Sequence, residues 1–125
     1  MTLPNDPHDR RMTALVRPSD WSVAPATDAY DLIAIGGGTG GLVAATGGGL
    51  LGARTALIER ALLGGDCLVH GCVPSKSLLH AARVVHDIRQ AEHWGIGATV
   101  DGVDFTRVMG RLRAIRADIA DDDAA

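Results

Sequence analysis

The chain has 125 residues, enough for one ordinary domain with one modest core. Apolar residues make up 46% and charged residues 22%, as in globular proteins, although sixteen glycines are more than usual. Twelve Lys and Arg against fifteen Asp and Glu leave a net charge of −3, and no basic stripe alternates with aromatic residues, which argues against nucleic-acid binding. Since the charged N-terminal residues do not resemble a secretory signal and no long apolar span occurs, we expect a cytoplasmic protein without a membrane helix.

The first segment, residues 1–28, contains four of the five prolines and shows no sustained hydrophobic periodicity. Prolines without a periodic apolar pattern are typical of loops and linkers. We therefore expect an irregular N-terminal arm.

After this arm the pattern predicts an α/β fold with a parallel βαβ unit. Residues 30–35, "YDLIAI", and 54–59, "RTALIE", are short β-rich apolar runs, typical of strands that are buried on both faces of a parallel sheet. A helix from residue 39 to about residue 51 lies between them and fits a right-handed crossover. Three glycines, residues 47–49, fall inside this helix, where they either allow close packing or end the helix near Gly47.

Two amphipathic helices are expected further along the chain. The first covers residues 74–91, with Pro74 suited to the first turn. The second begins behind Asp104 as a possible N-cap and runs into the acidic end "DDDAA". One apolar face of this last helix is expected to contain Phe105, Val108, Met109, Leu112, Ile115 and Ile119.

The segment "IGGGTGG" contains Gly36-x-Gly38-x-x-Gly41 between the first strand and its helix. Gly36 permits a tight turn, Gly38 lets the backbone approach a pyrophosphate, and Gly41 lets helix and strand pack closely. The phosphates would lie at the helix N-terminus, where free N–H groups favour anions. Glu59, at the end of the second strand, can accept hydrogen bonds from ribose hydroxyls, so the pattern indicates FAD or NAD rather than NADP.

Both cysteines lie in "GGDCLVHGCVPSK", spaced as Cys67-x-x-x-x-Cys72. In a reducing compartment such a pair is catalytic, redox-sensing or metal-binding, and no further cysteine pair completes a zinc site, so no metal is expected. The following helix start and Lys76 would lower a thiol pKa. Because a dithiol exchanges two electrons, and a flavin is the common dinucleotide that passes electrons to a disulfide, the pattern favours a redox pair beside FAD.

The segments "IGGGTGG", "LIER", "LLGGDC" and "GCVPSK", in this order and spacing, resemble the FAD segment of the pyridine nucleotide–disulfide oxidoreductases. This is the family of dihydrolipoamide dehydrogenase, glutathione reductase and mercuric reductase. The arm "VRPSDW" followed by "GGDC" is most similar to the mercuric-reductase-like branch. The resemblance covers residues 30–91 best. It implies a partial Rossmann-like FAD-binding fold, in which residues 29–125 form the N-terminal part of the FAD/NAD(P)-binding domain.

The resemblance also implies roles for individual residues. Those that would bind FAD are Gly36, Gly38, Thr39, Gly41, Glu59, Arg60, Gly65, Asp66, Cys67 and Lys76. Cys67 would be the interchange thiol exposed to substrate, Cys72 the charge-transfer thiol against the flavin, and Lys76 a catalytic neighbour of the flavin N5. Where the family commonly has "CLNVGC", this chain has "CLVHGC", so Val69 and His70 would alter the surroundings of the disulfide.

The function expected from the resemblance is electron transfer from NAD(P)H through FAD to a Cys67–Cys72 disulfide and on to a disulfide or metal-ion acceptor such as Hg(II). Family members are homodimers and contain further domains, so about a quarter of such an enzyme is represented here. We expect the 125 residues alone to be inactive and to hold FAD weakly. The alternative is a truncated module that only binds a nucleotide, or a soft metal through its two thiols.

Overall fold

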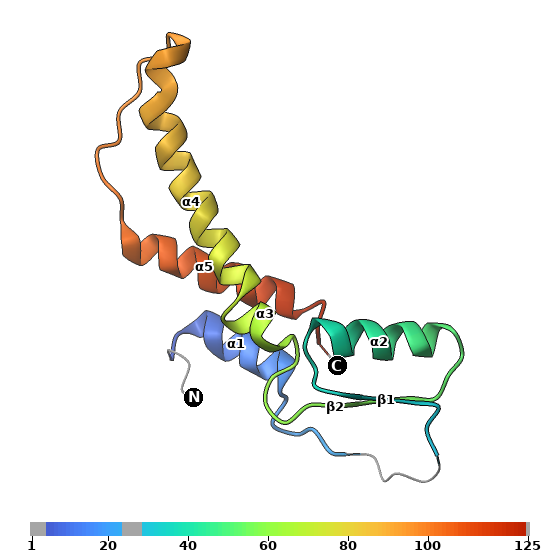
Figure 1. Ribbon diagram of the computed structural model, residues 1–125. Coiled ribbons are helices and arrows are strands. Elements are labelled where there is room, and N and C mark those ends of the chain that lie inside the picture. The colour runs from blue at the N-terminus through green and yellow to red at the C-terminus, as the bar shows by residue number, and fades with distance from the viewer. Residues whose placement is uncertain (1–4, 24–28, 125) are drawn as a thin grey trace.

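The computed structural model of the chain describes residues 5–23 and 29–124. The elements in chain order are α1 (Pro7–Val16), β1 (Leu32–Ile35), α2 (Thr39–Leu50), β2 (Thr55–Ile58), α3 (Gly65–Val69), α4 (Cys72–Gln90), the 3₁₀ helix η1 (Ala91–Trp94) and α5 (Phe105–Ala120). Figure 1 shows two parts: a βαβ lobe made of β1, α2 and β2, and a helical cluster in which α1, α3 and α5 pack together while α4 extends away.

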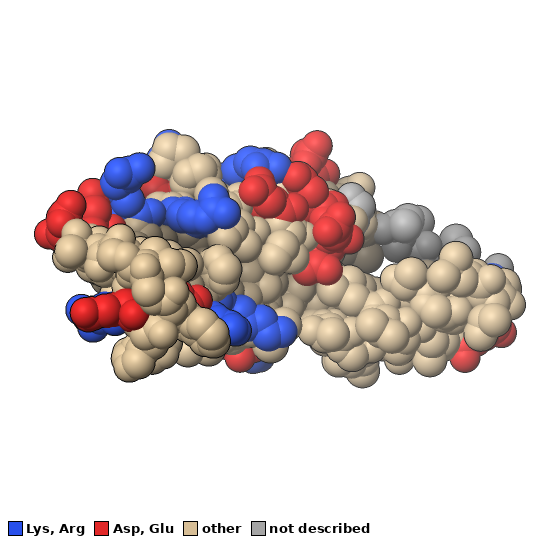
Figure 2. All heavy atoms as spheres, turned by 90° about the horizontal axis from the view of Figure 1, so that it is seen from above, with Lys and Arg blue, Asp and Glu red and all other residues tan. Residues whose placement is uncertain are grey.

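The βαβ lobe confirms the expected α/β class and the partial Rossmann-like topology. The two strands are parallel, with Leu32 opposite Thr55 and Ile35 opposite Ile58, and α2 contacts both. The expectation that both faces of the sheet are buried is wrong for this structure, because α2 covers one face while Ile33 and Ile35 are exposed on the other. Residues 32–58 contain one charged residue, Arg54, and this lobe is accordingly almost free of blue and red in Figure 2.

Helix α2 runs through all three internal glycines and ends at Leu50, so the helix does not end near Gly47. A Cβ atom at Gly48 would lie 2.7 Å from Cγ2 of Thr55 and 2.9 Å from Cδ2 of Leu32. Gly48 therefore allows α2 to pack closely on both strands. At Gly47 a Cβ atom would meet nothing within 4 Å, so packing in the described part of the chain does not require a glycine at this position.

The expected irregular arm at residues 1–28 is wrong where the structure describes it, because it contains the ten-residue helix α1. Asp6 caps this helix by accepting hydrogen bonds from the backbone N–H groups of His8 and Asp9, both at 2.9 Å. Pro7 occupies the first turn, where proline is favoured. Met12 and Val16, four residues apart, are buried against the helical cluster, so tertiary packing stabilises the helix. Residues 1–4 and 24–28 lie outside the described parts.

The expected last helix is confirmed as α5, with Asp104 accepting a hydrogen bond from the Arg107 N–H at 3.0 Å. The expected apolar face is confirmed in part, because Leu112 is buried and Ile119 packs against the core, but Phe105 is not covered and further residues are buried. Phe105 is 65% exposed, whereas the buried residues are Leu112, Arg116, Ala117 and Ala120. The difference arises because α1 packs along α5, and small alanines allow that close approach.

A buried ion pair joins three elements of the helical cluster. Arg116 of α5 donates to the carboxylate of Asp9 in α1 and, at 2.8 Å, to the carbonyl oxygen of Val69 in α3. Burial raises the pKa of Asp9, and the guanidinium of Arg116 opposes that rise. A second contact, 3.0 Å between Nε of Arg113 and Oδ2 of Asp6, lies beside it. These ionic contacts fix the position of α1 on α5.

The expected helix over residues 74–91 is present as α4, which begins two residues earlier at Cys72. It is preceded by the short helix α3, which the sequence pattern did not predict. None of the residues of α4 is fully buried, and Figure 1 shows it projecting from the cluster. Within residues 5–23 and 29–124, none of the helices combines the length and apolar character needed to cross a membrane.

Replacement of Asp9 by Asn should lower the free energy of unfolding by about 3–5 kcal/mol, because it leaves the buried Arg116 guanidinium without a carboxylate. Urea denaturation followed by circular dichroism measures the change. Asp118→Asn is the matched control, because Asp118 pairs with Arg11 on the surface and such pairs contribute about 0–1 kcal/mol. Equal effects of the two substitutions would contradict a stabilising role for the buried pair.

Replacement of Gly47 by Ala should raise the free energy of unfolding by about 1 kcal/mol, because alanine favours the helix and its Cβ atom has open space. Gly48→Ala makes the same chemical change one residue further on, but there the Cβ atom would overlap Thr55 and Leu32. We expect it to lower the free energy of unfolding by about 1–3 kcal/mol. Thermal or urea unfolding of both variants tests this, and stabilisation by Gly48→Ala would contradict the close packing of α2.

Candidate nucleotide and thiol site

The glycine loop between β1 and α2 makes a tight turn that brings the helix onto the strand. Gly36 has a φ of 105°, which favours glycine, and its N–H donates to the Ile58 carbonyl oxygen at 2.7 Å. A Cβ atom at Gly41 would lie 1.8 Å from the Gly36 carbonyl oxygen, so any side chain there is excluded. Gly38 caps α2 without a side-chain hydrogen bond. The first N–H groups of α2 therefore have no side-chain acceptor and can receive an anion.

A second glycine pair, after β2, packs against this loop. The Gly64 N–H donates to the Gly37 carbonyl oxygen at 2.8 Å, and Gly64 pairs with Gly38 as a parallel bridge. Gly64 and Gly65 have φ values of 83° and 56°, and a Cβ atom at Gly65 would lie 2.8 Å from Cα of Gly38. The sequence interpretation included Gly65 but missed Gly64, for which the adjacent glycine was the available signal. Because α3 begins at Gly65, this contact places Cys67, two residues further on, near the glycine loop.

Glu59 directly follows β2, and its carboxylate binds the glycine loop. One carboxylate oxygen accepts from the Gly37 N–H and the other from the Ala61 N–H, each at 2.6 Å. The hydrogen bond from Gly37, followed by that from Ala61, lowers the pKa of Glu59, and the neighbouring Arg60 contributes to the same shift. Glu59 therefore stays ionised at neutral pH, with remaining acceptor capacity for a hydroxyl group.

Cys67 lies in α3 and Cys72 is the first residue of α4, and both are free thiols. A hydrogen bond with Cys72 is the main reason that the pKa of Cys67 is lowered, and a hydrogen bond with Thr39 adds to it. The same partner raises the pKa of Cys72. The positive charge of Lys76 lowers the pKa of both thiols, although it is not the main influence on either. Cys67 is thus the thiol that ionises first.

The exposure of the two thiols is the reverse of the expected order. Cys67, expected to be exposed to substrate, is half-buried, while Cys72 is exposed. The reason is local, because Cys67 faces Thr39 and the start of α2 whereas Cys72 begins a helix that projects from the cluster.

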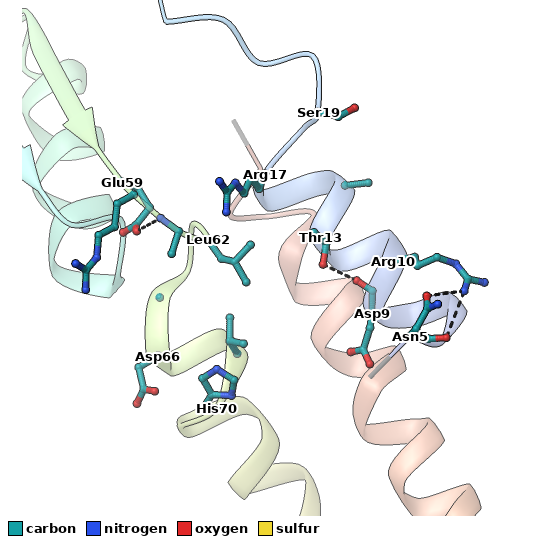
Figure 3. Close-up of a pocket in the computed structure, with 15 residues that line it drawn as sticks. Asn5, Asp9, Arg10, Thr13, Arg17, Ser19, Glu59, Leu62, Asp66 and His70 are labelled. Carbon is teal, nitrogen blue, oxygen red and sulfur yellow. Dashed lines mark hydrogen bonds between the residues drawn. The ribbon is translucent and has the colours of Figure 1, made fainter. Parts of the chain in front are cut away.

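The expected site residues border two different cavities. A cavity of about 990 Å³ is lined on one side by residues of α1 and on the other by Glu59, Arg60, Gly65 and Asp66 (Figure 3). A smaller cavity of about 240 Å³ is lined by Thr39, Cys67 and, from the end of the chain, Asp123. The carboxylate end and the thiol end of the expected site therefore border separate cavities, one lined by Gly65 and the other by Gly64. Cys72 and Lys76 line neither cavity.

Sequence reasoning missed the residues that α1 and its C-cap contribute to the larger cavity, among them Asp9, Arg10 and Thr13 of the helix and the C-cap Arg17. The signal was present as Asp6 followed by Pro7, an N-cap followed by the proline favoured in a first helical turn. Asp123, which lines the smaller cavity, belongs to the acidic end "DDDAA", to which the sequence analysis assigned no role in the site. Burial and the neighbouring Asp122 raise the pKa of Asp123.

A βαβ unit with a glycine loop, next to a pair of thiols of unlike pKa, defines the class of nucleotide-binding redox proteins. The sequence profile of "Pyridine nucleotide-disulphide oxidoreductase" matches residues 30–121. The chain belongs to this family, which uses FAD and NAD(P)H, and the resemblance stated from its motifs is confirmed. Helix α1 precedes the matched segment.

Curated relatives of the chain include dihydrolipoyl dehydrogenases from several organisms. That of Bacillus subtilis is 43% identical over 86 residues, which are 69% of this chain and 18% of the relative. That of Zymomonas mobilis is 42% identical over 93 residues, 74% of this chain and 20% of the relative. Dihydrolipoyl dehydrogenase 2 of Haloarcula marismortui is 53% identical over 76 residues, 61% of this chain and 16% of the relative. The chain thus spans about a fifth of the length of the first two relatives.

Alkylation by iodoacetamide should reach its half-maximal rate at a lower pH for Cys67 than for Cys72, because a thiol with a lowered pKa remains a thiolate at lower pH. Cys72→Ala should move the Cys67 profile to higher pH, since the hydrogen bond that most lowers its pKa is lost. Thr39→Val should move it in the same direction by a smaller amount. Mass spectrometry of the two cysteine-containing peptides measures each rate, and coincident or reversed profiles would contradict the assigned directions.

Proposed function

We propose that this chain provides the pyrophosphate and ribose site of FAD and the redox thiol pair of an NAD(P)H-dependent disulfide oxidoreductase. In this function electrons pass from NAD(P)H through FAD to the Cys67–Cys72 pair and then to an acceptor. The observation that carries the proposal is that Thr39, the first residue of α2, and Cys67 line the same small cavity, where the Thr39 side chain helps to lower the pKa of Cys67. Two motifs with separate chemical meanings thereby form one site.

The residues of the glycine loop fit a dinucleotide. Gly36, Gly38, Thr39 and Gly41 would hold the pyrophosphate, because the start of α2 has N–H groups without side-chain acceptors and the Cβ side of Gly38 has no atom closer than Cα of Gly65 at 4.0 Å. Glu59 would accept hydrogen bonds from the adenosine ribose. When bound, FAD would supply a two-electron carrier between the nicotinamide and the disulfide.

Further residues would complete this site. Arg60 lies next to the ribose-binding carboxylate, and Gly65 and Asp66 would line FAD along the segment that leads to the thiols. Lys76 would lie near the flavin and stabilise negative charge there, as it already lowers the pKa of the thiols.

The order of the steps by which the dithiol reduces an acceptor follows from the lowered pKa of Cys67 and the raised pKa of Cys72. The Cys67 thiolate attacks an acceptor disulfide R–S–S–R, forming Cys67–S–S–R and releasing one RS⁻. Cys72, after losing its proton, attacks the Cys67 sulfur, closes the Cys67–Cys72 disulfide and releases the second RS⁻. The acceptor gains two electrons and the dithiol loses two, so the pair must be reduced again through FAD.

The acceptor is proposed as a disulfide of a small molecule or a protein, with Hg(II) as another candidate. The whole enzyme is proposed to be a homodimer, as is usual for the family. The close thiols also favour a second candidate, a module that binds a soft metal through two thiolates. Within the described ranges, 5–23 and 29–124, no cluster of three or more metal-binding side chains occurs.

The redox function predicts that the free-thiol count of the chain cycles between two and zero as glutathione buffers are changed from reducing to oxidising. Peptide mass spectrometry should locate a Cys67–Cys72 bond in the oxidised form. Two thiols that stay free in every buffer would contradict the redox function. Retention of a stoichiometric metal ion that blocks their oxidation would favour the soft-metal module instead.

Replacement of Glu59 by Ala should weaken FAD binding about tenfold or more, because charge-assisted hydrogen bonds to the ribose contribute about 1.5–3 kcal/mol each. Equilibrium dialysis against FAD measures the ratio of affinities even where the affinity of the chain is low. Glu92→Ala in η1 is the matched control, because it removes one exposed carboxylate outside both cavities. Equal affinities of the Glu59 variant and the unchanged chain would exclude Glu59 from the FAD site.

A further inference from the structure

The larger cavity has one wall that does not come from the segment matched by the family. Helix α1, residues 7–16, and the residues around it form this wall, whereas the match begins at residue 30. Figure 3 shows Asp9, Thr13 and Arg17 of this wall across the cavity from Glu59 and Leu62. Helix α1, which lies outside the segment matched by the family, therefore faces the Glu59 carboxylate that is proposed to bind ribose.

The position of this wall is fixed by contacts on both sides. The Leu63 N–H donates to the Val16 carbonyl oxygen at 3.2 Å, which ties the end of α1 to the segment after β2. The Arg17 N–H donates to the Thr13 carbonyl oxygen at 2.9 Å. Since Val16 is also buried, the backbone of Arg17 is held at the edge of the cavity.

Three of the six Asp, Glu and Arg side chains that line the cavity are already used by other contacts. Asp9 pairs with Arg116, and Nη1 of Arg10 donates to Asn5 Oδ1 at 3.0 Å. Glu59 accepts from two backbone N–H groups. For the Arg17 side chain, by contrast, the described part of the chain provides neither a hydrogen-bond acceptor nor a carboxylate partner. A planar cation is thus available at the cavity edge facing Glu59.

Resting on the proposed function, we propose that α1 covers the adenine end of the bound dinucleotide and that the Arg17 guanidinium stacks on the purine. The Gly37 N–H of the glycine loop donates to Glu59, and the larger cavity is lined by Glu59 but by none of the loop residues 36–41. A ribose at Glu59 with its phosphates on the loop side therefore directs the base into this cavity. There Ala61 and Leu62 offer apolar surface and Arg17 offers a planar cation, a combination that suits a purine.

Stacking is favoured over binding of a ribose 2′-phosphate. An ionised Glu59 next to the ribose repels a phosphate at that position, and the pKa of Glu59 is lowered by its backbone hydrogen bonds. The role of Arg17 would then depend on its planar shape as well as on its charge. Lysine, which has the charge without the plane, would not replace it.

The test is an NMR titration of the complete chain with 5′-AMP, which contains the adenosine end without the flavin. Binding should shift the amide signals of residues 59–62 and also those of α1. Arg17→Ala should weaken the affinity for 5′-AMP about tenfold, Arg17→Lys should weaken it nearly as much, and Arg111→Ala should leave it unchanged. Arg111 is the matched control because it is an exposed arginine on α5 that lines neither cavity.

The outcomes separate this inference from the function on which it rests. Shifts at residues 59–62 without shifts in α1, or equal affinity of the Arg17→Ala variant, would overturn the covering role of α1 and leave the nucleotide site standing. Full rescue by Arg17→Lys, or a loss seen with 2′,5′-ADP but not with 5′-AMP, would overturn stacking. No shifts at residues 59–62 would contradict the nucleotide site itself and the inference with it. Thermal unfolding of each variant confirms that the fold is kept.

Discussion

The site depends on the close approach of two backbone segments, the loop between β1 and α2 and the glycine pair after β2. A Cβ atom at Gly65 would overlap the backbone of Gly38. A Cβ atom at Gly41 would overlap the Gly36 carbonyl oxygen. Because these contacts involve backbone atoms, no side chain can move aside to relieve a substitution. The approach has a chemical result, since it brings Cys67 within hydrogen-bonding reach of Thr39 at the start of α2.

The helical cluster supports the same segment from the other side. Arg116 of α5 donates to the Val69 carbonyl oxygen at the end of α3 and to Asp9 of α1. One buried guanidinium therefore joins α3, the helix that bears Cys67, to both α1 and α5. Leu68 and Val69 of α3 pack in the same core as Met12 and Val16. The short helix that bears Cys67 is therefore held by the ion pair and by the hydrophobic core.

The two thiols differ because each influences the other. The hydrogen bond between them stabilises the thiolate of Cys67 and disfavours ionisation of Cys72, while Lys76 favours ionisation of both. A pair with one ready nucleophile and one thiol that ionises later is suited to exchange in two ordered steps. At the other end of the site the Glu59 carboxylate is ionised and held by backbone N–H groups, which suits it to receive neutral hydroxyl groups.

The sequence by itself determined the local features. The strands around residues 32–35 and 55–58, the tight turn at Gly36, the contact at Gly41 and the Asp104 cap could be predicted, because each depends on residues close in the chain. The packing role of Gly48 stayed open as one of two alternatives, because helix propensity alone cannot reveal what lies opposite a glycine. Only the tertiary structure decided it.

The tertiary structure also decided what α1 does and which face of α5 is buried. Helix α1 is stabilised by contacts with residues about a hundred positions away, Arg116 among them, which no local pattern can display. For the same reason Phe105 is exposed while Arg116 is buried. The order of thiol exposure likewise depends on the position of Cys67 beside Thr39 and of Cys72 at the start of the exposed helix α4. Local chemistry thus determined which residues could form the site, and long-range packing determined how they face one another.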